Sequence, residues 1–257
     1  MAGLLRELYN RALYYISVPK CISCGEILEY GERALCAKCS STYREQKKRN
    51  CSRCAKLLPE CSCSNFYLES HYIKRLAKVY RYVPSDLSLP GNLLIYNLKH
   101  ANRRDTFAFL AEELASSILN VYDVRGNEQS FIVTNVPRRS VAVRRDGYDH
   151  SAVLAKRVAS LLGIEYKQYL KSKAKKAQRE MKGSARRKNA VFDYKRGATE
   201  NLRGKTVILI DDVVTTGSSL GSCATLLRGM GTRKILGAAV SIAYKDSYVL
   251  PKDKRYD

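Results

Sequence analysis

Short apolar runs alternate with segments of helical periodicity along most of the chain beyond residue 72. The runs are rich in β-branched residues and predict buried strands at 77–83, 131–136, 207–210 and 235–242. Between them, apolar side chains recur every three or four positions, which predicts helices at 90–100, 104–119 and 150–162. Strands that alternate with helices favour an α/β fold, with a mostly parallel sheet flanked by helices.

The strand predicted at 207–210 is followed by two carboxylates and a loop of small residues. Asp211 and Asp212 fall at its carboxyl end, where open α/β sheets bind ligands. The loop precedes a helix expected near its last residue, and it consists of Thr215, Thr216, Gly217, Ser218 and Ser219. Paired carboxylates accept hydrogen bonds from a cis-diol, and N–H groups at a helix N-terminus bind phosphate. The pattern therefore predicts a sugar-phosphate site; the alternative is an Asp-Asp turn followed by an ordinary Thr/Ser helix cap.

Eight of the nine cysteines lie between positions 21 and 63, in two groups of four. The first group, Cys-x2-Cys-x11-Cys-x2-Cys, has the two knuckles of a zinc ribbon, and the second, Cys-x2-Cys-x6-Cys-x-Cys, is less regular. The expected metal ligands are Cys21, Cys24, Cys36, Cys39, Cys51, Cys54, Cys61 and Cys63. They would hold one or two structural Zn²⁺ ions, with disulfides as the alternative for an oxidising compartment.

Residues 1–64 contain too little apolar content to fold by burial alone, so metal binding would supply the folding energy. We expect this segment to form a zinc-ribbon module of its own, ahead of a second domain at 72–257. Basic side chains decorate the module. It could therefore lie along a phosphate backbone, although zinc ribbons also serve as protein docking surfaces.

Charge points to anionic ligands. The formal net charge is +22 over 257 residues, and the hydrophobic content of 45% is enough for a sizeable core. Such an excess of cations favours either a nucleic acid or a small ligand with several phosphates, and charge alone does not separate the two.

No apolar stretch approaches the length of a membrane span. Residues 1–16 have charged residues among their leucines and tyrosines, which predicts a short amphipathic helix rather than a signal peptide. We therefore expect no membrane insertion, reduced cysteines and a cytoplasmic location.

The string 207–220 closely resembles the 5-phosphoribosyl-1-diphosphate (PRPP) binding motif of type I phosphoribosyltransferases. By that resemblance, Asp211 and Asp212 would hold the ribose hydroxyls, and the small-residue loop would hold the 5-phosphate. The PRPP-binding residues it implies are Asp211, Asp212, Val213, Thr215, Thr216, Gly217, Ser218 and Ser219, together with Arg138 and Arg139, whose backbone N–H groups would take the diphosphate.

Over nearly the whole chain, the order of parts is similar to the ComF family of competence-associated phosphoribosyltransferase-like proteins. A cysteine module leads, residues 97–100 are similar to the Leu-Lys-aromatic segment of the family, and residues 136–139 are similar to its Val-Pro loop. The turn at 145–150 departs from the usual Arg-Gly-aromatic-Asn-Gln, because Asp146 precedes the glycine and Asp149-His150 replaces the amide pair. The resemblance implies the type I phosphoribosyltransferase fold and a role in DNA uptake and natural transformation, with single-stranded DNA as the nucleic acid.

The resemblance also implies two accessory segments. Residues 171–192 keep the Gln, Arg, Asn and Phe spacing of the family and would form a cationic lid over the diphosphate, with Arg186 as its main contact. The alternative is a solvated basic loop, which could equally touch DNA. Residues 76–120 would form the hood that selects the acceptor.

The reaction implied is displacement of diphosphate from the anomeric carbon of PRPP in the presence of Mg²⁺, with Asp211, Asp212 and Arg186 as the candidate catalytic residues. His100 and His150 are the imidazoles expected near the site, each as a structural group or hydrogen-bond donor rather than as a base. Three interpretations stand: a phosphoribosyltransferase, a non-catalytic zinc-containing factor that handles single-stranded DNA and has a regulatory PRPP site, and a docking protein for a helicase or DNA-uptake partner.

Overall fold

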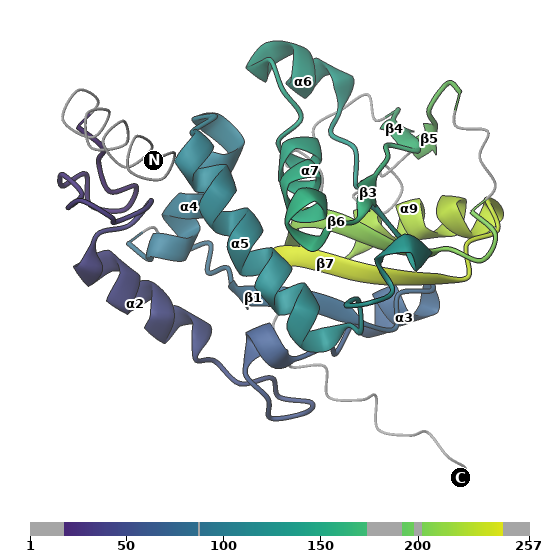
Figure 1. The fold of residues 1–257 in the computed structure, drawn as a ribbon, viewed down its shortest axis with the longest axis horizontal. Coiled ribbons are helices and arrows are strands. Elements are labelled where there is room, and N and C mark those ends of the chain that lie inside the picture. The colour runs from purple at the N-terminus through teal and green to yellow at the C-terminus, as the bar shows by residue number, and fades with distance from the viewer. Residues whose placement is uncertain (1–17, 87, 174–191, 198–201, 244–257) are drawn as a thin grey trace, which may run out of the picture.

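The computed structural model describes residues 18–86, 88–173, 192–197 and 202–243, and a central sheet covered by helices dominates it (Figure 1). Five strands form the sheet in the order β1-β7-β6-β2-β3, and each neighbouring pair is parallel. Their bounds are Leu76–Arg81 for β1, Phe131–Asn135 for β2, Glu165–Tyr166 for β3, Thr206–Val214 for β6 and Lys234–Ile242 for β7. The mostly parallel sheet expected from the sequence is thus confirmed.

A second, two-stranded sheet pairs β4 with β5 in antiparallel fashion. These strands span Leu170–Ser172 and Phe192–Tyr194. The described helices are α2 Ala37–Lys47, α3 Phe66–Ser70, α4 Pro90–His100, α5 Arg104–Val121, α6 Ser140–Asp146, α7 His150–Leu162 and α9 Ser218–Gly229. Short 3-10 helices lie at Leu58–Glu60 and Glu128–Ser130.

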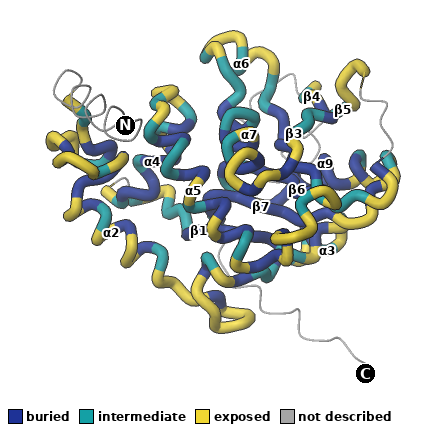
Figure 2. Tube along the Cα trace, in the orientation of Figure 1, coloured by how far each residue is buried: buried dark blue, intermediate teal, exposed yellow. Residues whose placement is uncertain are grey.

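Alternate residues of the central strand β6 face opposite layers of helices. Ile208 and Ile210 belong to the core on the side of α5 and α7, whereas Val207 and Leu209 belong to the core on the side of α9 and α3. All four are fully buried, and Figure 2 shows the sheet as a continuous buried region between the helices. Burial on both faces explains why this strand is apolar at every position rather than alternating with polar residues.

β6 is longer than the sequence pattern predicts, because β7 pairs with it as far as Val214. Pairing with β2 stops at Ile210, so Asp211 and Asp212 lie within the last part of the strand rather than after it. The other predicted strands and helices agree with the structure to within two residues at each end. The shorter elements, β3 to β5 and α6, had too few residues to show a period.

The cysteine-rich segment packs along α4, α5 and β1. Tyr43 of α2 is buried there, and its ring lies 5.5 Å from that of Tyr80 and 5.4 Å from that of Phe109, centroid to centroid. Lys47 of α2 also pairs with Glu113 of α5 at 2.6 Å. The buried side chains of this segment therefore belong to the two cores of the α/β domain: those between 21 and 43 to the core on the side of α5 and α7, and those between 51 and 61 to the core on the side of α9.

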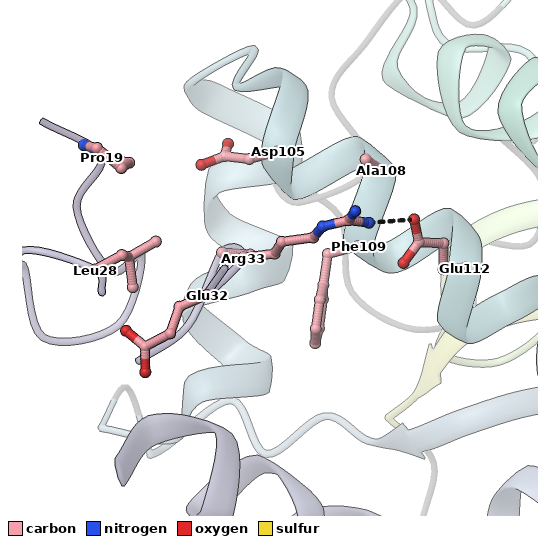
Figure 3. A pocket seen from close by; sticks show the side chains of 9 residues that line it. Pro19, Leu28, Glu32, Arg33, Asp105, Ala108, Phe109 and Glu112 are labelled. Carbon is pink, nitrogen blue, oxygen red and sulfur yellow. Dashed lines mark hydrogen bonds and ion pairs between the residues drawn. The ribbon is translucent and has the colours of Figure 1, made fainter. Parts of the chain in front are cut away.

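A small pocket lies at this junction, between the segment around Arg33 and the outer side of α5 (Figure 3). Arg33 extends across it toward Glu112, with Nη1 3.4 Å from Oε1. The pocket is lined by residues of the cysteine-rich segment and α5 and by none of the residues of the predicted sugar-phosphate site.

The predicted amphipathic helix at 1–16 lies outside the described residues. Among the helices that the structure does describe, none combines the length and the apolar content needed to cross a bilayer.

Candidate functional site

Two carboxylates lie near the carboxyl end of β6. Asp212 is 7% exposed and Asp211 is half-buried. Each accepts a hydrogen bond from the next residue in the chain: Asp212 N–H donates to Asp211 Oδ1 at 2.9 Å, and Val213 N–H donates to Asp212 Oδ1 at 2.7 Å. Val213, a predicted PRPP contact, thus uses its N–H to hold a carboxylate.

Two side chains from distant helices meet Asp212. Lys99 Nζ, in the last turn of α4, and His150 Nε2, at the start of α7, each lie 3.0 Å from Asp212 Oδ2. His150 is 7% exposed, and its Nδ1 has no hydrogen-bond partner among the described residues. The carboxylate is therefore surrounded on one oxygen by a cation and an imidazole, and His150 acts here as a partner of Asp212.

The pKa values of the two carboxyl groups are shifted in opposite directions. Burial by itself would raise the pKa of Asp212, but the charge of Lys99 and the contact with His150 outweigh it and hold that pKa far below its usual range. Burial and the neighbouring charge of Asp212 raise the pKa of Asp211 well above its ordinary value. One carboxylate is thus kept ionised, while its neighbour binds a proton more readily.

The phosphate loop, residues 215–219, leads from β6 into α9. Thr215 and Thr216 are exposed, and Thr216 Oγ1 lies 3.0 Å from Ser218 Oγ and accepts the N–H of Ser218 at 3.3 Å. Gly217 has φ of 87°, a left-handed conformation that favours glycine. The first turn of α9 leaves N–H groups without intrahelical partners, so the loop offers donors and hydroxyls to an anion.

The loop after β2 lies beside this edge of the sheet, since Val136 N–H donates to Ile210 O at 2.9 Å. Arg138 is engaged in the ligand-free protein: its guanidinium pairs with Asp146 at 2.5 Å, and its N–H donates to Asp149 Oδ2 at 3.1 Å. Both the guanidinium and the N–H of Arg138 therefore have partners within the protein.

The turn that departs from the family pattern has a structural role. Asp149 caps α7, because its Oδ1 accepts the N–H of Ala152 at 3.2 Å, while its other oxygen holds the backbone of Arg138. Asp146 lies between two arginines, and the hydrogen bond from Arg145, together with the charge of Arg138, holds the pKa of Asp146 well below its usual value. The substituted residues thus organise the loop that follows β2.

Only the two ends of the predicted lid are described. Residues 171–173 and 192 lie in or next to β4 and β5, and the backbone of Ser172 bridges to that of Arg139. The stem of the lid segment is therefore next to the loop after β2. Arg186 and the rest of 174–191 lie outside the described residues.

The predicted hood, residues 76–120, contributes β1 to the central sheet and α5 to its cover. The part of this segment that reaches the carboxylates is the last turn of α4, through Lys99.

Both cysteine quartets are gathered as tetrahedral metal sites require. The four Sγ atoms of each quartet lie within 4.8 Å of one another, and all eight cysteines are free of disulfides. Cys24 Sγ and Cys36 Sγ are 3.7 Å apart in the first quartet, and Cys54 Sγ and Cys61 Sγ are 3.5 Å apart in the second. Zinc–sulfur bonds of about 2.3 Å in a tetrahedron place sulfurs about 3.8 Å apart, so both quartets fit Zn²⁺.

The two knuckles share one turn. Gly25 N–H donates to Cys21 O at 3.0 Å, and Ala55 N–H donates to Cys51 O at 2.9 Å. Both residues have positive φ, 79° for Gly25 and 58° for Ala55. The irregular spacing of the second quartet therefore does not prevent its first pair from forming a regular knuckle, although an alanine occupies the position that favours glycine.

Two features of this site were not expected from the sequence. Lys99 was predicted only as part of the family-like segment 97–100 and not as a partner of Asp212. The contact of Asn65, at the start of α3, with Thr216 in the phosphate loop had no signal in the sequence. A cation at the end of an amphipathic helix is too common to identify a partner more than a hundred positions away.

Comparison with known proteins agrees with this geometry. The phosphoribosyl transferase domain family matches residues 149–257. DNA utilization protein YhgH of Salmonella typhimurium (strain LT2) is 25% identical over 225 residues, which cover 86% of this chain and 96% of the relative. Competence protein F of Haemophilus influenzae is 23% identical over 231 residues, which cover 84% of this chain and 93% of the relative.

Among solved structures, the purine phosphoribosyltransferase from Pyrococcus horikoshii is similar at 19% identity and a TM-score of 0.35, over 54% of this chain and 81% of that one. The sequence match to the domain family and the parallel sheet with its flanking helices identify a phosphoribosyltransferase-like fold. The paired cysteine quartets lie ahead of that domain, and along most of its length the chain is similar to proteins named DNA utilization protein YhgH and competence protein F, in agreement with the ComF resemblance of the sequence.

Proposed function

We propose that this protein binds PRPP with Mg²⁺ at the carboxyl end of β6 and transfers its phosphoribosyl group with release of diphosphate. The observation that carries the proposal is the ionised Asp212, held by Lys99 and His150 directly ahead of the phosphate loop. An ordinary turn and helix cap has no need of a buried carboxylate held by a lysine and an imidazole.

The ribose hydroxyls would donate to the carboxylates of Asp211 and Asp212, while residues 215–219 take the 5-phosphate through N–H groups and hydroxyls. Arg138 and Arg139, together with Arg186, would bind the diphosphate. In the reaction, the bond between the anomeric carbon and the diphosphate oxygen breaks, and its electron pair leaves with diphosphate. The acceptor forms the new bond to that carbon and loses its proton.

Mg²⁺, bound together with PRPP, would supply positive charge that neutralises the leaving group. Lys99 and His150 would keep Asp212 ionised as the hydroxyls bind, so that it opposes positive charge developing on the sugar. The proposed catalytic residues are therefore Asp211 and Asp212, which bind the ribose hydroxyls, and Arg186, which binds the leaving diphosphate.

The test is diphosphate release from PRPP and Mg²⁺, measured with a panel of nucleobases and with single-stranded DNA as possible acceptors. We expect release above the spontaneous rate with at least one acceptor and its loss in Asp212→Asn. PRPP binding without release for any acceptor would instead favour the regulatory, non-catalytic interpretation.

We further propose that the two quartets hold structural Zn²⁺ and that the protein acts in the cytoplasm, where thiols remain reduced. The folding of this segment around shared core residues would then depend on metal.

A second proposed activity is binding of single-stranded DNA during DNA uptake. Its support is the names of the relatives, the charge of +22, and exposed aromatic side chains near α3. Tyr72 is 52% exposed, with the guanidinium of Arg228 5.4 Å from its ring centroid, and Phe66 is 68% exposed. Bases stack on such surfaces while cations contact the backbone.

Fluorescence anisotropy with a labelled oligonucleotide tests this activity, and the affinity should fall steeply with salt. Tyr72→Ala should weaken binding, whereas Leu161→Ala, which truncates a comparably exposed side chain on α7, should not. If the wild type fails to bind even at low salt, docking of a helicase or DNA-uptake protein becomes the favoured role of the cysteine-rich segment.

A further inference from the structure

A short segment connects the second cysteine quartet directly to the phosphate loop. It begins at the last ligand, Cys63, and passes through Ser64 and Asn65 into α3. α3 packs on α9, the helix that the phosphate loop leads into.

Asn65 contacts the phosphate loop while it caps α3. Its Oδ1 accepts the N–H of Leu68 at 2.8 Å, and its Nδ2 donates to the carbonyl oxygen of Thr216 at 3.4 Å. One side chain therefore orients the first turn of α3 and restrains the backbone of the loop in which Thr216 lies.

Leu68 packs against the left-handed residue of the loop. It is fully buried, and a Cβ atom placed on Gly217 would lie 2.7 Å from Leu68 Cγ. One turn later, a Cβ on Gly221 of α9 would lie 2.9 Å from the ring of Tyr67, which stacks on His71 at 4.2 Å between centroids. Glycine is thus required at two positions for α3 to approach this closely.

The second knuckle is tied to α3 by Arg53, which lies between the ligands Cys51 and Cys54. Its Nη1 donates to Ser64 O at 2.5 Å and pairs with Glu69 of α3 at 2.7 Å. On the sheet side, the buried Lys78 donates to the carbonyl oxygens of Cys61 at 3.1 Å and Cys63 at 2.7 Å. The knuckle, α3 and the loop are therefore joined by short contacts.

We infer that the second cysteine quartet and α3 form a support that holds the phosphate loop in its binding conformation. Asn65 and Leu68 are positioning residues for the loop, and Arg53 transmits the position of the metal-bound knuckle to them. The inference rests on the proposed function for the identity of the ligand, but the support itself is a property of the ligand-free protein.

The test is hydrogen exchange of the backbone amides at 216–221 in the metal-loaded, ligand-free protein. Arg53→Ala and Asn65→Ser should speed this exchange by about fivefold, the effect of one lost hydrogen bond, while zinc content and melting temperature stay near the wild-type values. Serine keeps a cap acceptor but is too short to reach Thr216. Arg53→Lys, which retains the charge opposite Glu69, should restore part of the protection, and Lys56→Ala is the control for loss of one exposed cation on the same knuckle.

Metal dependence is tested with a matched pair of ligand variants. Cys24 and Cys54 are the exposed second ligands of the first and second knuckles. Cys54→Ser should speed exchange at 216–221, whereas Cys24→Ser should affect only its own quartet. Equal, wild-type exchange at 216–221 in Arg53→Ala, Asn65→Ser and Cys54→Ser would overturn the inference.

Binding of ribose 5-phosphate, measured by calorimetry, connects the support to function. Arg53→Ala and Asn65→Ser should weaken it by about fivefold or more. A wild-type protein that binds neither ribose 5-phosphate nor PRPP would refute the proposed function, and the exchange data would still decide whether the segment supports the loop.

Discussion

Neutralising the two carboxylates separately should change the stability of the ligand-free protein in opposite directions. Asp212→Asn leaves Lys99 without its counter-ion and His150 without its carboxylate partner. At 3.0 Å and an effective dielectric constant of about 20, the attraction between Lys99 and Asp212 is about 5 to 6 kcal/mol before desolvation is subtracted. Losing one partner of a fully buried pair costs roughly 3 to 5 kcal/mol, and because Lys99 retains 22% exposure we expect about 2 to 3 kcal/mol.

Asp211→Asn should instead stabilise the protein by about 1 kcal/mol at pH 7.5, because its ionised form is disfavoured by burial and by the charge of Asp212. Asparagine keeps an oxygen to accept the N–H of Asp212. For a chain of this size, Asp212→Asn should lower the melting temperature by about 4 to 10 °C, and Asp211→Asn should raise it by about 2 to 4 °C.

The pH dependence separates the two effects. The raised pKa of Asp211 means that the folded protein binds this proton more tightly than the unfolded chain, so wild-type stability is lost as the pH rises through the folded-state pKa. The advantage of Asp211→Asn should therefore shrink between pH 7.5 and pH 4.5. Asp212, with its lowered pKa, contributes stability that is lost only as the pH falls below the unfolded value of about 3.9, so the deficit of Asp212→Asn should persist at pH 4.5.

Thermal or guanidinium unfolding of both variants at the two pH values is the assay. Destabilisation of similar size in both variants, with no dependence on pH, would refute the electrostatic assignment of this pair. It would indicate that the two side chains serve only as parts of a turn.

Three further outcomes follow from the same structure. Lys99→Met should weaken PRPP binding by tenfold or more in calorimetric titration, because Asp212 loses the cation that holds its pKa down, and Lys99→Arg should retain part of the affinity. Metal analysis should find close to two Zn²⁺ per chain, and Cys54→Ser should retain close to one; metal-free protein with oxidised cysteines would contradict both quartets as sites. Ala55→Gly should raise the unfolding free energy by about 0.5 to 1 kcal/mol, since φ of 58° is strained for alanine; denaturant melts that show a loss of stability would rule out strain at this knuckle.

The sequence predicted the features that depend on neighbouring residues. The fully apolar run 207–210 is explained by burial on both faces, and the carboxylates and glycine loop follow it within nine positions. The first cysteine knuckle was also predictable, because the ligand spacing and Gly25 are typical of a local turn. Each of these patterns lies within a short stretch of sequence, so it can be recognised without knowledge of the fold.

Contacts between distant segments could not be predicted from the sequence. Asn65 and Thr216 are 151 positions apart, and their approach depends on how α3 packs on α9. Tyr43 and Tyr80 are buried against each other, although the sequence of α2 is too polar to predict a buried face. The low apolar content of residues 1–64 gave no sign that their buried side chains pack into the same cores as the rest of the chain.

Calorimetric titration of the wild type and of Asp212→Asn with PRPP and Mg²⁺ at pH 7.5 tests the central assignment most directly. We expect saturable binding with one PRPP per chain in the wild type. In Asp212→Asn the protein should remain folded, and the affinity should fall by at least tenfold. Equal PRPP affinity in the two proteins, or no binding by the wild type, would contradict a PRPP site built on the end of β6.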